Sequence, residues 1–270
     1  VTDSLKGLGR LGRLVRERIN PKVLAITGSC GKTTVKEMAT AILRQEGEVL
    51  ATAGNFNNEV GVPLTLLRLE AQHQFAVMEL GANHPGEIAW TTSLARPDAA
   101  IINNVAAAHL EGFGSLEGVF HAKSEIFEGL SEGGTAIVNA DNEFWPKWQA
   151  KGIRCAFSLE DQSQPFHARD IALNGQGCAE FVMVTPQGEL TLTLAIPGRH
   201  NVANALAVTQ ANREYQERAL ARDGLRRMYI GTLTLSLFLA VFGAVLLAVV
   251  IGNQLARPLL LLADGVRQVA

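Results

Sequence analysis

The feature that most constrains the fold is a glycine-rich segment, residues 28–34 (GSCGKTT), which lies between an apolar run and a helical pattern. The apolar run Lys22–Thr27 predicts a strand, and the spacing over 32–45 predicts a helix. Strand, glycine loop and helix in this order favour a phosphate site, because the loop amides and the helix N-terminus attract anions. In such a loop Lys32 neutralises phosphate charge and the Thr33 hydroxyl can bind Mg²⁺.

The residues after this loop alternate between strand-like and helical patterns. Strands are expected at 75–80, 99–103, 135–139 and 153–157, and helices at 86–94, 116–130 and 143–150. This alternation is typical of a parallel sheet covered by helices on both faces. Residues 168–196 differ, because turns at 174–175 and 186–188 predict short antiparallel strands. The expected fold class is α/β, a parallel sheet with a phosphate loop, helices on both faces and a small antiparallel appendage.

Charge and cysteine content exclude several classes of protein. The 270 residues carry 24 Lys and Arg against 26 Asp and Glu, a net charge of −2, which argues against a nucleic-acid binder. The balance is uneven, because residues 1–211 hold 17 basic and 22 acidic side chains and residues 212–270 hold 7 and 4. The cysteines, Cys30, Cys155 and Cys178, are too irregularly spaced for a disulfide framework or a zinc site and fit a reducing compartment.

An uncharged apolar stretch predicts a single transmembrane helix. No charged residue occurs from Met228 to Ala256, and 18 of the 23 residues in 229–251 are hydrophobic. At about 1.5 Å per residue this length spans a hydrocarbon core of about 30 Å, whereas a soluble core helix of this length would need a polar face. We expect a charged juxtamembrane helix at 212–227 and a membrane span at 228–252, which would make the chain a single-pass inner-membrane protein.

The flanks of this span indicate its orientation. Five arginines lie in 212–227 and two follow the span, so the preceding flank is expected to be cytoplasmic. Beyond the span, Arg257-Pro258 opens an amphipathic stretch, and 253–270 resembles the start of a HAMP linker. The whole C-terminal part is similar to the second membrane span of a nitrogen-regulation-type sensor histidine kinase.

The first residues also follow a helical period. Apolar residues over 1–19 recur at steps of three and four, and the basic residues Lys6, Arg10, Arg13 and Arg16 lie off this stripe. The pattern indicates an amphipathic helix that packs on the next domain; a membrane-surface helix and a transit peptide are the alternatives. Because the chain begins with Val1, we expect 1–20 to be a linker helix from a preceding domain.

Six segments, taken in order, resemble motifs of the Mur ligases, which build the peptide stem of peptidoglycan. They are 28–34 (GSCGKTT), 55–63 (NFNNEVGVP), 78–88 (MELGANHPGEI), 103–111 (NNVAAAHLE), 122–127 (AKSEIF) and 197–205 (PGRHNVANA). Together they are most similar to the subfamily that adds D-alanyl-D-alanine to UDP-MurNAc-tripeptide. The resemblance implies that 21–211 is a central ATP-binding domain.

The resemblance also implies a reaction and its residues. The chain would be part of an ATP-dependent amide-bond ligase that works through an acyl phosphate, with ATP and Mg²⁺ as cofactors and UDP-MurNAc-tripeptide and D-Ala-D-Ala as substrates. The catalytic residues would be Lys32, Glu79, His109 and Lys123, and the metal ligands Thr33, Glu79, His109 and, once carbamylated, Lys123. The nucleotide would contact Gly28, Ser29, Cys30, Gly31, Lys32, Thr33, Thr34, Asn201 and Asn204, and the substrate would contact Asn55, Asn57 and Asn58.

Taken singly, these side chains also have ordinary structural interpretations. A glutamate at a strand end and a lysine on a helix are commonly exposed surface residues. Asn201 fits a helix N-cap, and the asparagines in 55–58 fit a loop. The order of the motifs favours the functional interpretation.

Two expectations concern the chain as a whole. Mur ligases have three domains, so a chain with only the central one should bind MgATP but carry out little or no ligation. An ATP site and a HAMP linker are both cytoplasmic, yet one span separates its flanks, so we expect two unrelated gene fragments joined near 211–213. The alternative is a membrane sensor with a nucleotide-binding soluble part. Such a sensor needs Lys32 and Thr33 but has no use for Glu79, His109 and Lys123 together.

Overall fold

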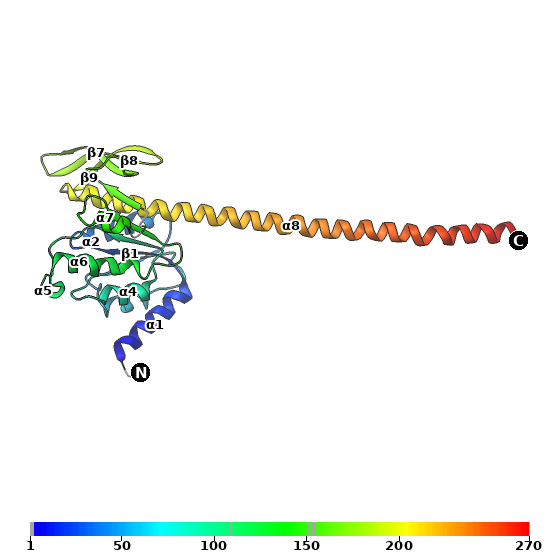
Figure 1. Cartoon of the computed structure of the whole chain (residues 1–270), viewed down its shortest axis with the longest axis horizontal. Coiled ribbons are helices and arrows are strands. Elements are labelled where there is room, and N and C mark those ends of the chain that lie inside the picture. Colours follow the sequence, from blue (N-terminus) through cyan, green and yellow to red (C-terminus); the bar gives the residue numbers. More distant parts are fainter. Residues whose placement is uncertain (1–2, 109, 151, 153–154, 270) are drawn as a thin grey trace. The chain divides into compact units, whose positions relative to one another are not determined.

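The computed structural model describes residues 3–108, 110–150, 152 and 155–269. It comprises two compact units, Val1–Tyr215 and Gln216–Ala270. The first unit carries a sheet and its covering helices, some of which are labelled in Figure 1. The second unit consists of the rest of the last helix.

Within the described residues a nine-stranded sheet forms the frame of the first unit. In chain order its strands are β1 (Lys22–Thr27), β2 (Val49–Ala51), β3 (Phe75–Glu79), β4 (Ala99–Ile102), β5 (Thr135–Asn139), β6 (Cys155–Ser158), β7 (Phe166–Leu173), β8 (Cys178–Thr185) and β9 (Gly188–Pro197). Their order across the sheet is β2-β3-β1-β4-β5-β6-β7-β8-β9. Pairing is parallel from β2 to β7 and antiparallel from β7 to β9, which confirms the predicted parallel sheet and its appendage.

Helices precede, connect and follow the strands. They are α1 (Ser4–Ile19), α2 (Lys32–Leu43), α3 (Gly61–Leu66), α4 (Glu87–Ala95), α5 (Leu110–Phe113), α6 (Leu116–Ser124), the 3₁₀ helix η1 (Glu125–Phe127), α7 (Trp145–Ala150) and α8 (His200–Val269). α4 lies on one side of the sheet and the first turns of α8 lie on the other (Figure 1). The predicted helices on both faces are therefore confirmed.

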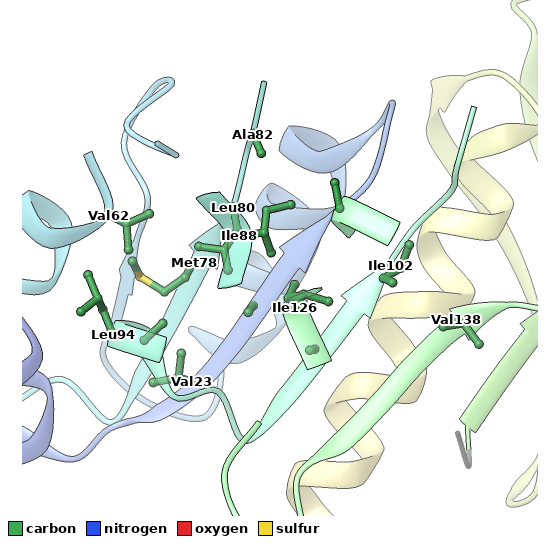
Figure 2. Packing of buried hydrophobic residues seen from close by; sticks show 14 of the residues in the cluster. Val23, Val62, Met78, Leu80, Ala82, Ile88, Leu94, Ile102, Ile126 and Val138 are labelled. Atoms are coloured by element: carbon green, nitrogen blue, oxygen red, sulfur yellow. The ribbon is translucent and has the colours of Figure 1, made fainter. Parts of the chain in front are cut away.

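Two hydrophobic clusters hold these layers together, because successive side chains of a strand point to opposite faces. From β1, Val23 and Ala25 enter one cluster and Leu24 and Ile26 enter the other, and all four are at most 1% exposed. Figure 2 shows the first cluster, in which strand residues such as Val23 and Met78 face side chains from α3 and α4. Since both faces of these strands are buried, their sequences are almost continuously apolar.

The N-terminal helix packs within the first unit, as the apolar stripe predicts, but Arg16, which was expected off the stripe, is only 6% exposed. Asp3 caps α1, its carboxylate accepting from the backbone N–H groups of the next turn. Gly9 and Gly12 face α4 and α3, and a Cβ added at Gly12 would lie 3.0 Å from the Pro63 carbonyl oxygen. Glycine at the contact therefore allows the close approach of α1.

Several elements differ from the sequence expectation. β2, α3 and α5 are short and have no clear period of their own, and they were not predicted. The pattern over 116–130 forms α6 and then tightens into η1. The strand expected at 153–157 is β6, and residues 153 and 154 lie outside the described residues.

The start of α8 completes the first unit beyond the expected boundary at residue 211. The Arg213 guanidinium lies 5.6 Å from the centre of the Phe166 ring, and Thr135 donates a 3.1 Å hydrogen bond to the Glu214 carboxylate. Tyr215 is 6% exposed and meets the Phe75 ring edge-on at 6.4 Å. Residues 212–215 therefore pack as part of the α/β unit.

The second unit contains a candidate membrane span. Ile230–Leu247 is long and apolar enough to cross a bilayer by length and composition, with a mean hydropathy of 2.3. α8 continues helical past Arg257-Pro258 to Val269. A proline removes one backbone hydrogen bond, and a long helix can continue past such a single loss with a kink.

Candidate functional site

The phosphate loop leaves the carboxyl end of β1 and enters α2. Gly28 has φ 153° and Gly31 has φ 77°, conformations that favour glycine, and Gly31 is the N-cap of α2. A Cβ at Gly31 would lie 2.7 Å from the Asn103 amide nitrogen. Lys32 folds back over the loop and donates a 2.9 Å hydrogen bond from Nζ to the Gly28 carbonyl. The first turn of α2, with Thr33 and Thr34, therefore presents backbone N–H groups that have no helical acceptor.

The loop is fastened to the segment that follows β4. The Ser29 hydroxyl donates to the Ala106 carbonyl and accepts from the Ala106 N–H, both at 2.9 Å. The Cys30 N–H donates to the Asn104 side-chain oxygen at 2.9 Å. Ser29 and Cys30 were predicted as nucleotide contacts. In this structure the Ser29 hydroxyl and the Cys30 backbone N–H form hydrogen bonds that position the loop. The Cys30 thiol is exposed.

Glu79 ends β3 beside the phosphate loop. The parallel register pairs Ile26 with Glu79, so the residues after both strands lie at one edge of the sheet. Thr33 donates to Glu79 Oε2 at 3.1 Å, and Asn57 Nδ2 donates to Oε1 at 2.9 Å. The carboxylate is 3% exposed, and Thr52, which the sequence analysis missed, accepts from the Glu79 backbone N–H.

These oxygen ligands fit Mg²⁺. A carboxylate and a hydroxyl within hydrogen-bond distance are hard donors, and Mg²⁺ commonly takes one or two protein ligands and completes its shell with water and phosphate. Over the described ranges, no group of three or more His, Cys, Asp or Glu side chains could hold a metal ion. The arrangement therefore fits a magnesium ion that is shared with a nucleotide better than a cage made by protein alone.

Lys123 lies in α6 and is 1% exposed. Burial, and then the positive charge of Lys32, lower the pKa of Lys123 from 10.5 to about 8, against the opposing pull of Glu125 and Glu87. Its Nζ lies 5.7 Å from the centre of the Phe113 ring. The structural interpretation of Lys123 as an exposed surface residue is therefore wrong. His109, predicted as a metal ligand, lies outside the described residues.

Asn201 and Asn204 belong to a buried chain of amides. Asn103 Nδ2 donates to Asn204 Oδ1, and Asn204 Nδ2 donates to Asn201 Oδ1, both at 2.8 Å. Asn201 Nδ2 in turn donates to the Pro197 carbonyl at 2.7 Å. The Asn201 side chain therefore does not act as an N-cap acceptor for α8. Together these bonds connect the segment after β4 to the start of α8.

A cavity of about 420 Å³ opens beside the phosphate loop. Its lining residues are Cys30, Gly31, Asn103, Asn104, Asn139, Asp141, Leu159, Glu160, Arg199, His200, Ala203 and Asn204. Asn204 lines it and Asn201 supports Asn204 from behind. Most of the remaining lining was missed by the sequence analysis, although Asn103 and Asn139 stand at the ends of predicted strands, where parallel sheets bind ligands.

The three predicted substrate asparagines take different roles. Asn57 contacts Glu79 and stands in the site. Asn58 is exposed, and its side chain accepts from the Gly61 N–H at 2.8 Å at the start of α3. Asn55 is exposed in the loop before α3. The structure brings together the loop, Glu79, Asn57 and Lys32. The charge of Lys32 also lowers the pKa of Lys123.

The fold and this site define an α/β nucleotide-binding domain with a phosphate loop. Residues 26–211 match the Mur ligase middle domain, and the chain belongs to the Mur ligase family. It is 55% identical over 210 residues to the UDP-N-acetylmuramoyl-tripeptide–D-alanyl-D-alanine ligase of Escherichia coli, covering 77% of this chain and 46% of the relative. Its identity to the ligase of the same name from Bacillus subtilis is 35% over 218 residues, 78% of this chain and 45% of that one.

Solved structures agree with these sequence relatives. MurF from Acinetobacter baumannii superposes with a TM-score of 0.75 at 42% identity, over 80% of this chain and 48% of that one. MurF ligase from Thermotoga maritima, solved in complex with ADP, gives 0.72 at 28% identity, over 80% and 50%. The chain spans about half the length of the curated relatives it matches.

Proposed function

We propose that this chain binds MgATP and is the ATP-binding part of a ligase that joins D-Ala-D-Ala to UDP-MurNAc-tripeptide. The observation that carries the proposal is the 3.1 Å hydrogen bond between Thr33, on the phosphate loop, and the buried Glu79. A structure similar to this chain was solved with ADP, and a relative 55% identical to it is named for this ligation. The nucleotide phosphates would lie on the loop and its base in the adjoining cavity.

In the proposed reaction the tripeptide carboxylate takes the terminal phosphoryl group of ATP, and the amine of D-Ala-D-Ala then displaces phosphate to form the amide. Both steps gather negative charge, so stabilisation must come from cations and oriented dipoles. The loop amides and the Lys32 ammonium would hold the phosphates, which requires Lys32 to leave the Gly28 carbonyl. Magnesium held by Thr33 and Glu79 would neutralise phosphate charge. Asn57 keeps the Glu79 carboxylate oriented.

Lys123 is proposed to act after carbamylation, as the family resemblance implies. Reaction with CO₂ requires an uncharged amine, and the pKa of about 8 makes that form accessible near neutral pH. The product would be an anion able to contribute to a second metal site. His109 remains a proposed ligand of the same metal.

Binding can be tested on the full chain with Cys30 as a reporter, because its thiol is exposed and lines the cavity. At MgADP concentrations ten times Kd, alkylation of Cys30 should slow about tenfold, in proportion to the free fraction. Alkylation of the half-buried Cys155 and the buried Cys178 should not change and serves as the internal control.

Two variants sharpen this test. Lys32→Met should weaken MgADP binding by about tenfold to a hundredfold, as expected for a lost hydrogen bond to a charged group. Glu79→Gln should reduce the dependence of affinity on Mg²⁺. Unchanged Cys30 alkylation at every MgADP concentration, together with no calorimetric heat of binding, would contradict the proposed function.

We also propose that Ile230–Leu247 crosses the inner membrane, with the α/β unit on the cytoplasmic side where ATP is present. The length and hydropathy of this segment support the proposal. The rival assignment, a membrane sensor, would bind nucleotide through Lys32 and Thr33 alone. A buried Glu79 oriented by Asn57 and a buried Lys123 favour the ligase.

A further inference from the structure

Two oppositely charged side chains join separate walls of the nucleotide cavity. Glu160 follows β6, and Arg199 precedes α8, and both line the cavity. Arg199 Nη2 donates to Glu160 Oε1 at 2.8 Å. The two side chains are 53% and 70% exposed, so the pair lies at the rim of the cavity rather than inside it.

The Glu160 side of this bridge is held firmly by local hydrogen bonds. The Glu160 N–H donates to the Ser158 hydroxyl at 3.0 Å and to Asp141 at 3.3 Å. Asp141 also accepts from the Leu159 N–H at 2.7 Å and from the Ser158 hydroxyl. The loop after β6 is therefore fixed to Asp141, two residues after β5, and the Glu160 backbone is held by these hydrogen bonds.

The Arg199 side of the bridge belongs to the turn that starts α8. Gly198, with φ 106°, reverses the chain after β9, and the Arg199 carbonyl accepts from the Val202 N–H in the first turn of α8. Asn204, four residues after His200 in the same helix, also lines the cavity and accepts a hydrogen bond from Asn103. A bridge at Arg199 therefore restrains the wall that carries Asn204.

We propose that the Glu160–Arg199 ion pair is a strap across the cavity mouth that slows nucleotide release by keeping the two walls together. The inference rests on the proposed nucleotide site and assigns positioning roles, not catalytic ones, to both residues. An exposed ion pair contributes little, so its loss should speed release by about two- to fivefold. Because the pair faces solvent, added salt should weaken it in the wild-type chain.

The experiment measures dissociation of the fluorescent nucleotide mant-ADP, with Mg²⁺, from the full chain by stopped flow. Glu160→Gln should release mant-ADP about two- to fivefold faster at low salt and lose most of the salt dependence seen in the wild type. The matched control is Glu189→Gln, which removes an exposed ion pair of similar geometry, Arg169–Glu189 at 2.6 Å, away from the cavity. That control should leave dissociation unchanged.

A charge reversal separates the strap from a direct contact with the nucleotide. Arg199→Glu alone should speed release, and the double variant Glu160→Arg/Arg199→Glu should restore slow, salt-sensitive release. Failure of the double variant to restore it, or equal rates for Glu160→Gln and the wild type, would overturn the strap while leaving nucleotide binding intact. A wild-type chain that does not bind mant-ADP would instead overturn the proposed function and the strap with it. Melting temperatures within about 2 °C across the set show that the fold is unchanged.

Discussion

At the scale of single residues, the site contains two buried ionisable side chains, and the cost of burying their charges is offset in different ways. Glu79 is 3% exposed, but Thr33 and Asn57 both donate hydrogen bonds to its carboxylate. Lys123 is 1% exposed, and its Nζ lies over the Phe113 ring, 5.7 Å from the ring centre. Its burial and the charge of Lys32 lower the pKa of Lys123 to about 8. Burying the charged Lys123 ammonium therefore lowers the free energy of unfolding, and such perturbed groups are common at functional sites.

This cost predicts how stability depends on pH. Below pH 8 Lys123 is protonated in the folded and unfolded chain, and its burial costs up to about 3 kcal/mol, the equivalent of the fall from 10.5 to about 8. Between pH 8 and 10.5 the folded chain loses the proton first, so this cost disappears as pH rises. Lys123→Met should therefore raise the unfolding free energy at pH 7 and lose that advantage by about pH 10.5.

The measurement is urea unfolding of the full chain in detergent, without metal or nucleotide, at pH 7 and pH 10. Lys6→Met, at an exposed lysine, is the control and should parallel the wild type at both pH values. If the unfolding free energies of the wild type and Lys123→Met differ by the same amount at pH 7 and pH 10, the lowered pKa of Lys123 is contradicted.

At the scale of elements, α4 is stabilised at both ends by side chains from other segments. Glu125, in η1, accepts from the Gly86 N–H at 2.7 Å and from the Ala89 N–H at 3.0 Å. Arg16, in α1, donates to the Ala95 carbonyl at 2.7 Å and to the Arg96 carbonyl at 2.8 Å. An anion at the N-terminus and a cation at the C-terminus both match the helix dipole. The side chains of Glu125 and Arg16 therefore fix the two ends of α4 to η1 and α1.

Removal of the N-terminal cap should destabilise this region. Glu125→Ala leaves two backbone N–H groups without their acceptor, so the unfolding free energy should fall by about 1–2 kcal/mol. Glu125→Gln keeps one acceptor oxygen and should lose less. The exposed Glu128→Ala is the control and should change stability by under about 0.5 kcal/mol. Equal stability of Glu125→Ala and Glu128→Ala in urea unfolding would show that the cap contributes nothing.

At the scale of the whole molecule, the chain continues from an α/β unit into a helix that contains the apolar segment Ile230–Leu247. Tyr215 belongs to the first unit, and Gln216 begins the second. The described side chains of Ile230–Leu247 are exposed, including Leu237 at 68% and Phe238 at 65%. Large apolar side chains in such number require a lipid or protein environment. The proposed membrane span follows from this requirement.

The span predicts fractionation and topology together. The chain should stay in the membrane pellet after high-salt and alkaline carbonate washes, and Cys30 should react with an impermeant maleimide only after the cells are opened. The double variant Leu237→Arg/Phe242→Arg costs about 3 kcal/mol per charge at the bilayer centre and should shift the chain to the supernatant. Release of the wild-type chain by salt alone would contradict a spanning helix, and reaction of Cys30 in intact cells would reverse the proposed orientation.

Much of the site could be predicted because its signals are local. The phosphate loop can be recognised from the order of its glycines, Lys32 and Thr33. Glu79 can be located because it ends an apolar strand. Short elements such as β2 and α5 escaped prediction, because three or four residues carry no period. Asn103 and Asp141 were missed as site residues for a different reason, since their roles depend on partners about a hundred and about seventeen residues away.

The strand-loop-helix order, the parallel sheet buried on both faces and the apolar segment could be read from residue order, because each follows from spacing between near neighbours. Folding in three dimensions was needed to bury Lys123 where the charge of Lys32 acts on it, to place Asn57 and Thr33 on one carboxylate, and to bring Glu160 to Arg199 at the cavity. The physical reason is that charge, burial and hydrogen bonding depend on distance in space. Parallel strands bring distant residues to one edge of the sheet, and no local pattern records which of them will meet there.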